Sequence, residues 1–97
     1  MTTYSGPMEP TREQAEAAIL DLLARRDPGK TICPSDAARA LGGDEHFRAL
    51  MPLVRDAARA LVAARRIEVT QSGQPVDLDA ARGAIRLRAL RRDSPRR

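Results

Sequence analysis

A long amphipathic stretch that turns directly into an alternating one constrains this fold more than any other feature of the chain. Over residues 44–66, apolar side chains recur with the i, i+3, i+4, i+7 spacing of a helix with one buried face. These side chains are Phe47, Leu50, Met51, Val54, Ala57, Ala58, Leu61 and Val62. Residues 67–71 and 84–88 then alternate apolar with polar side chains, which predicts two strands. The sequence therefore predicts a long helix followed by a β-hairpin.

The part of the chain before this helix predicts two more helices. Thr11-Arg12-Glu13-Gln14 fits a capping box, and the helix that it starts ends at Asp27-Pro28-Gly29, where proline cannot continue the hydrogen-bond ladder. Ser35 is expected to cap a brief helix over residues 37–41, which Gly42-Gly43 ends. Between these two helices, residues 31–33 form a short extended piece that we expect to pair with the later hairpin as a third strand.

Two details complete the expected architecture. Pro52 leaves the apolar stripe of the long helix in phase, so we expect one slightly bent helix that reaches Arg65 or Arg66. The connection over residues 72–83 is long for a hairpin tip, and its second half is expected to hold a helical turn. This order indicates an α+β, mainly α fold: a winged helix-turn-helix with three helices and a small antiparallel β-hairpin or three-stranded wing.

Length and composition indicate one domain of 97 residues. We expect a flexible N-terminal leader over residues 1–10, the domain over residues 11–90 and a basic C-terminal tail over residues 91–97. No apolar run is long enough for a membrane span, and the N-terminus lacks the basic and apolar segments of an export signal. The single cysteine, Cys33, excludes an internal disulfide. These features favour a soluble, bacterial, cytoplasmic protein.

The net charge of +4 is unevenly spread along the chain. Residues 1–43 hold five basic and six acidic side chains, whereas residues 44–97 hold twelve basic and seven acidic ones. Arginine accounts for 16 of the 17 basic residues. The long helix and the hairpin therefore lie in the half of the chain whose positive field attracts a polyanion.

Four runs of sequence resemble a family of short bacterial proteins known only as a domain of unknown function with a winged-helix fold. The runs lie within residues 26–41, 48–52, 66–77 and 82–87, and the most distinctive are Pro28-Gly29-Lys30-Thr31-Ile32-Cys33-Pro34-Ser35 and Ile67-Glu68-Val69-Thr70-Gln71. The resemblance covers roughly residues 15–90. It implies a tryptophan where this chain has Phe47 and a glycine where it has Arg65. It also implies the fold, and it supplies no activity.

The candidate site residues are on the long helix and around the hairpin. Arg48, Arg55 and Arg59 are seven and four residues apart, so they lie nearly in line on one helix face, where arginine can bond guanine or phosphate. Small polar residues and arginines around the hairpin suit phosphate or minor-groove contact: Gln71, Ser72, Gln74, Arg82, Arg86 and Arg88. Against this reading, Asp44, Glu45, Asp56, Asp77 and Asp79 interrupt the positive surface.

The sequence favours binding of duplex DNA, as in a transcriptional regulator, without a cofactor or a small-molecule ligand. The alternative is a winged-helix protein–protein interaction module, and a homodimer or another protein partner fits either function. Gly29-Lys30-Thr31 lacks the first glycine of a phosphate-binding loop, because Ala24 stands there. Cys33 and His46 are too few for a zinc site, and no third group orients them for catalysis, so we expect neither a metal nor an enzyme.

Overall fold

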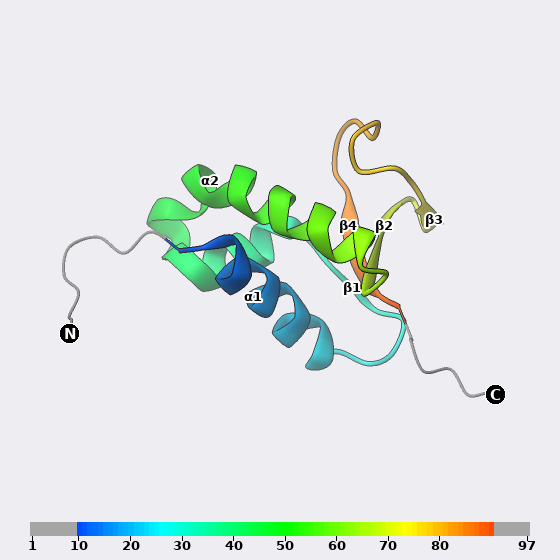
Figure 1. The fold of residues 1–97 in the computed structure, drawn as a ribbon, viewed down its shortest axis with the longest axis horizontal. Coiled ribbons are helices and arrows are strands. Elements are labelled where there is room, and N and C mark those ends of the chain that lie inside the picture. Colours follow the sequence, from blue (N-terminus) through cyan, green and yellow to red (C-terminus); the bar gives the residue numbers. More distant parts are fainter. Residues whose placement is uncertain (1–9, 91–97) are drawn as a thin grey trace.

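The computed structural model describes residues 10–90 of the chain (Figure 1). The elements are α1 (Arg12–Ala24), β1 (Thr31–Ile32), α2 (Pro34–Ala63), β2 (Ile67–Gln71), β3 (Gln74–Pro75) and β4 (Arg86–Ala89). The structure is therefore α+β and mainly helical, as predicted. The leader and tail expected at the two ends fall on residues 1–9 and 91–97, which lie outside the described residues. Within the described part of the chain, neither helix is long and apolar enough to cross a membrane.

The sheet is antiparallel, with the strand order β1-β4-β2-β3. Thr31 pairs with Arg88, which confirms the prediction that the extended piece before Cys33 joins the hairpin. The fourth strand, β3, was not predicted. Ser72 and Gly73 both have positive φ, 54° and 82°, and form a two-residue turn that folds β3 back on β2. The connection over residues 72–83 is therefore not one hairpin tip but a tight turn followed by a separate loop.

The core lies between the two helices and one face of the sheet. Ala15, Ile19 and Leu23 of α1 are buried against α2 and the strands. Their partners are Val54, Ala57, Ala58 and Leu61 of α2 and Ile32, Ile67, Val69 and Leu87 of the sheet. Alanine at several of these positions allows the helices to approach closely. Leu78 and Ile85 are also buried, which fixes the loop before β4 to the same core.

α2 is interrupted at Gly43, whose φ of 72° and ψ of −179° are not helical. This conformation is accessible almost only to glycine, because a Cβ atom strains it. Gly42, next to it, leaves room for the turn that follows: a Cβ atom there would lie 2.5 Å from Cδ1 of Leu50. The prediction of a short helix ending at Gly42-Gly43 and a long one after it corresponds to two helical segments, residues 34–42 and 44–63. The structure nonetheless has two helices, of which the second is broken, and not three separate ones.

The two ends of α2 differ from the predicted ends. The helix begins at Pro34, and its N-cap is Cys33 and not the predicted Ser35. Proline suits the first helical position because its missing N–H would have no partner there, and Asp36 accepts a hydrogen bond from the Cys33 N–H at 2.9 Å. The helix continues through Pro52, as predicted, and ends at Ala63. It stops short of the predicted end because Arg65 turns into the left-handed region, with φ of 63°.

Candidate nucleic-acid interface

Arg48, Arg55 and Arg59 lie on the second segment of α2, and we call them the arginine line. Their spacing of seven and four residues keeps them within about 40° of one another around the helix axis. Arg48 and Arg59 are exposed, and Arg55 is half-buried. The fold thus presents the three side chains along one side of α2, as the spacing predicts, but their surroundings differ.

Arg59 is bound within the protein. Its Nε and Nη2 atoms both donate to Oδ1 of Asp79, at 2.9 and 2.7 Å, and its Nη1 donates to Oδ1 of Asp56 at 2.7 Å. The hydrogen bonds and charge of Asp79, followed by those of Asp56, raise the pKa of Arg59 above its ordinary value. Arg59 therefore ties α2 to the loop before β4, and each of its three nitrogens donates one hydrogen bond within the protein.

That loop, residues 76–85, is held by contacts of its own. The carbonyl of Asp77 accepts from the N–H groups of Ala80 and Ala81, at 3.1 and 2.9 Å, which gives the predicted helical turn. The carboxylate of Asp77 accepts from the Asp79 N–H at 3.0 Å. Gln71 reaches across from β2, and its amide nitrogen donates to the carbonyls of Arg82 and Ala84. The side chain of Gln71 therefore shapes the loop that carries Arg82.

Arg86 and Arg88 brace the sheet. Arg86 donates to the hydroxyl and the carbonyl oxygen of Thr31 on β1, at 2.9 and 3.3 Å. Arg88 forms an ion pair with Glu68 on β2, where its Nε lies 2.7 Å from the carboxylate. Both arginines belong to β4, in the middle of the sheet, so each one joins its own strand to a neighbour.

Three cations of the candidate set have neither an ion pair nor a side-chain hydrogen bond among the described residues: Arg48, Arg55 and Arg82. Arg48 lies 5.4 Å from the ring centre of Phe47. Ser72 and Gln74 are exposed at the β2–β3 turn, away from the loop that carries Arg82 (Figure 1). The structure therefore joins the arginine line to this loop through Arg59 and Asp79, and it places the two polar residues on a second projection of the sheet.

Three of the acidic residues that interrupt the positive surface form ion pairs within the protein. Arg59 binds Asp56 and Asp79, and Arg39 lies 3.2 Å from Asp44. Glu45 and Asp77 form no ion pair with the described residues. Two arginines bind three carboxylates in these pairs, so one negative charge is left over. Together with Glu45 and Asp77 it offsets the charges of Arg48, Arg55 and Arg82, so the surface combines unpaired arginines with an equal number of negative charges.

Arg39 is a residue that the sequence did not single out. Its guanidinium lies 4.0 Å from the ring centre of Phe47, in addition to its ion pair with Asp44. These contacts connect the first segment of α2 with the second across Gly43, and they orient the start of the segment that carries the arginine line. The spacing of residues in the sequence does not predict these contacts of Arg39, because they depend on the direction in which the chain turns at Gly43.

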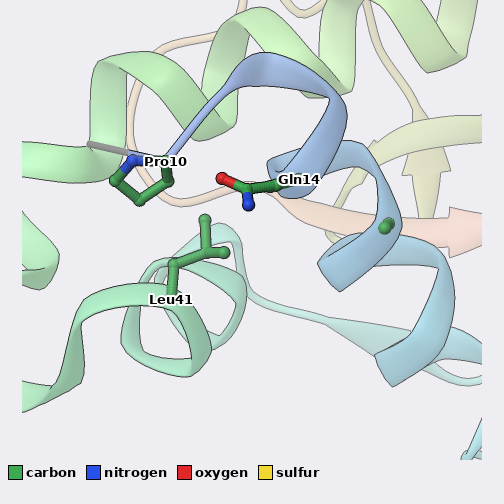
Figure 2. Close-up of a pocket in the computed structure, with 4 residues that line it drawn as sticks. Pro10, Gln14 and Leu41 are labelled. Atoms are coloured by element: carbon green, nitrogen blue, oxygen red, sulfur yellow. The ribbon is translucent and has the colours of Figure 1, made fainter. Parts of the chain in front are cut away.

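Other kinds of site find little support in the structure. Among residues 10–90, no three His, Cys, Asp or Glu side chains are grouped so that they could hold a metal ion. A hollow of about 340 Å³ lies between the start of α1 and the first segment of α2, lined by Pro10, Gln14, Ala17 and Leu41 (Figure 2). Its one polar side chain, Gln14, caps α1 by accepting from the Thr11 N–H at 2.8 Å. The hollow therefore offers a ligand no charged group.

Comparison with known proteins places the chain in a family. No curated protein matches it. The model of a family described as "Protein of unknown function (DUF3253)" matches residues 12–90, from the first residue of α1 to the residue after β4. Because this match spans the whole described fold, the chain belongs to the DUF3253 family of proteins of unknown function.

Proposed function

We propose that the protein is a winged helix-turn-helix that binds duplex DNA through the second segment of α2 and the wing. The topology supports this: three helical segments precede β2, and β4 lies between β1 and β2. In such a fold the helix before the hairpin enters the major groove, and the loops of the hairpin contact the backbone beside it. The wing here comprises the β2–β3 turn and the loop over residues 76–85.

The observation that carries the proposal is that Asp44, Asp56 and Asp79 are held in ion pairs that do not involve Arg48, Arg55 or Arg82. Two arginines, Arg39 and Arg59, bind these three carboxylates. Arg48, Arg55 and Arg82 consequently remain as cations for an external anion. Arg48 and Arg55 are about 10 Å apart along the helix, the length of about three base pairs, so they can reach different nucleotides.

The mechanism is binding alone. Arg48 and Arg55 neutralise phosphates or donate two hydrogen bonds to guanine in the major groove. Arg82, Ser72 and Gln74 contact the backbone from the wing. Arg59 takes part indirectly, because its bond to Asp79 fixes the loop that carries Arg82 against α2.

The alternative, a protein–protein interaction module that does not bind DNA, has less support from the surface. Such an interface needs an apolar centre of several adjacent side chains. Among the described residues, the exposed large apolar side chains are Val62 and Leu90, at 37% and 36% exposure. Single side chains of this kind are common on any protein surface.

The test is fluorescence anisotropy with a random duplex of about 25 base pairs, titrated with salt. The logarithm of the binding constant should fall linearly with the logarithm of salt concentration, and Arg48→Ala with Arg55→Ala should make the slope shallower by about 1.8, at about 0.9 per phosphate contact. Arg12→Ala with Arg25→Ala is the matched control: it also removes two arginines, one at the start of α1 and one directly after its end, where each forms an exposed i,i+4 ion pair. No binding at low salt, or an equal change in the control, would contradict the proposal.

A further inference from the structure

The topology brings two connections together at one end of the sheet. β1 and β2 both pair antiparallel with β4, so they run in the same direction and begin at the same end. Each of them follows the C-terminus of a helix. Two connections therefore lie at this end: the α1–β1 connection, residues 25–30, and the α2–β2 turn, residues 64–66 (Figure 1). The Leu90 N–H, directly after β4, donates to the Arg66 carbonyl at 3.0 Å and so joins the end of β4 to the α2–β2 turn.

Besides Arg25, which is paired with Asp21, these two connections carry four exposed cations, which we call the sheet-end cluster: Arg26, Lys30, Arg65 and Arg66. Lys30 directly precedes β1 and Arg66 directly precedes β2, so β4 alone separates them, and two strand spacings amount to about 10 Å. Asp27 is the single acidic residue in the two connections. No ion pair joins the cluster to any described residue, whereas nearby Arg25 and Arg88 are paired with Asp21 and Glu68.

The ends of the two helices explain how such a cluster is tolerated. Both α1 and α2 end here, and the unpaired carbonyls of a helix C-terminus carry a partial negative charge that cations stabilise. The cluster thus needs no acidic side chain for the fold to be stable. Its donors are left for an external ligand with several anionic groups.

The cluster is separate from the arginine line but within reach of the same extended ligand. Arg48 and Arg65 are 17 residues apart on α2 and its end, which corresponds to about 25 Å. A duplex covers this distance in about seven base pairs. A membrane surface fits less well, because the only apolar residues in the two connections are Pro28 and Ala64, which offer little to insert among lipids.

We propose that the sheet-end cluster is a second DNA contact, which holds the phosphate backbone of the same duplex beyond the part covered by α2 and the wing. This inference rests on the proposed function for its ligand. The contact is independent of base sequence, because lysine and arginine at exposed turns neutralise phosphates without reading base edges.

The cluster variant for the test is Lys30→Ala with Arg65→Gly. Arg65→Gly removes a charge and also relieves a positive φ, so lost binding cannot be attributed to unfolding at this position. With a duplex of about 25 base pairs the salt slope should become shallower by about 1.8, the same change as in Arg48→Ala with Arg55→Ala. Arg12→Ala, at the other end of α1, should leave the slope unchanged.

Duplex length separates a second contact from a general effect of charge. A hairpin duplex of about five base pairs, about 17 Å long, is too short to reach both surfaces at once. The ratio of wild-type to cluster-variant affinity should therefore approach one with the short duplex and be large with the long one. An equal ratio at both lengths overturns the proposal, as does tighter binding of the wild type to phosphatidylserine vesicles than to the duplex.

The two proposals fail in different ways. If only the Arg48 and Arg55 variant weakens binding, α2 binds DNA and the sheet-end cluster does not. If only the cluster variant weakens binding, the duplex contacts the end of the sheet and the proposed role of α2 is wrong. If neither variant changes the slope, both proposals are overturned.

Discussion

Asp79 accepts hydrogen bonds from both Nε and Nη2 of Arg59, and this pair joins α2 to the loop before β4 across 20 residues of sequence. The third nitrogen of Arg59 donates to Asp56, so one guanidinium binds two carboxylates. Arg59 shares a helix face with Arg48 and Arg55, yet it differs from them because all three of its nitrogens bind carboxylates of the protein. In the proposed complex with DNA, Asp79 competes with phosphate for the donors of Arg59.

Asp79→Ala should therefore raise the affinity for duplex DNA, because it removes the oxygen that accepts from Nε and Nη2 of Arg59. The change removes one negative charge and frees Arg59 for phosphate, so the salt slope should become steeper by up to about 0.9. The loop over residues 76–85 should also exchange its amide hydrogens faster. Anisotropy and hydrogen exchange measure the two effects.

Asp77→Asn is the matched control, because it removes the same charge while its amide oxygen can still accept from the Asp79 N–H. An equal rise in affinity in this control would mean that bulk charge, and not the release of Arg59, causes the effect.

The Arg59 pair should be insensitive to alkaline pH. Its carboxylate partners raise the pKa of Arg59, so the stabilisation is fully present below the ordinary pKa of arginine and is lost only above it. The ¹³Cζ chemical shift of Arg59 should be the same at about pH 7 and about pH 10, because arginine stays protonated at both. A shift that changes between these two values would show that the pair opens for another reason.

Gly43→Ala should lower the free energy of unfolding by about 1–3 kcal/mol, the cost of a non-glycine residue in this backbone region. A Cβ atom at Gly43 would meet no other atom within 4 Å, so the cost comes from the backbone and not from a clash. Urea unfolding measures it. Gly43→Asn should be no better, since asparagine tolerates the left-handed helical region but not a ψ of −179°. Wild-type stability in Gly43→Ala would mean that α2 can straighten at this point.

Much of the fold could be predicted because its signals are local. The capping box of α1 has both expected hydrogen bonds, between Thr11 and Gln14, at 2.8 and 3.1 Å. β2 has the predicted bounds, since the alternation of apolar and polar residues begins and ends with the strand. β3 was missed because Ser72-Gly73 lacks the Asn or Asp that usually marks such a turn, and because Pro75 is typical only of an edge strand.

The surroundings of the candidate site could not be predicted in the same way. Helical spacing places Arg48, Arg55 and Arg59 in line, but it cannot tell which of them meets a carboxylate from a distant loop. The partner of Arg59 depends on the path of residues 76–85, which is set by buried Leu78 and by Gln71. Contacts of this kind follow from the tertiary fold and leave no periodic trace in the sequence.

The contact between Arg39 and Phe47 should appear as a coupling energy. In a double-mutant cycle of Arg39→Ala and Phe47→Leu, we expect about 0.5–1 kcal/mol, because the guanidinium lies 4.0 Å from the ring centre. The cycle of Arg48→Ala with Phe47→Leu is the control and should give a smaller coupling energy, since the Arg48 guanidinium lies 5.4 Å from the ring centre of Phe47. Phe47→Trp should strengthen the coupling with Arg39, because indole attracts cations best. Equal coupling in both cycles would contradict this account of the turn.

Arg65→Gly should raise the free energy of unfolding by about 1 kcal/mol, since the left-handed conformation costs an L-residue about 1–2 kcal/mol and glycine far less. The helix end has the two hydrogen bonds of a Schellman motif, from the Arg66 N–H to the Leu61 carbonyl and from the Arg65 N–H to the Val62 carbonyl, both 2.9 Å. Arg65, with φ of 63°, stands where this motif favours glycine. Retaining arginine at a strained position is consistent with a role for its charge, as proposed for the sheet-end cluster.

Ala64→Gly is the control for this change, because Ala64 has φ of −85° and gains nothing from glycine there. It should lower the free energy of unfolding by about 0.5–1 kcal/mol, which urea titration distinguishes from the opposite effect at Arg65. Destabilisation by Arg65→Gly would mean that the arginine side chain makes a contact worth more than its backbone strain. The expected gain, combined with weaker duplex binding by the same variant, would separate the stability of the helix end from its function.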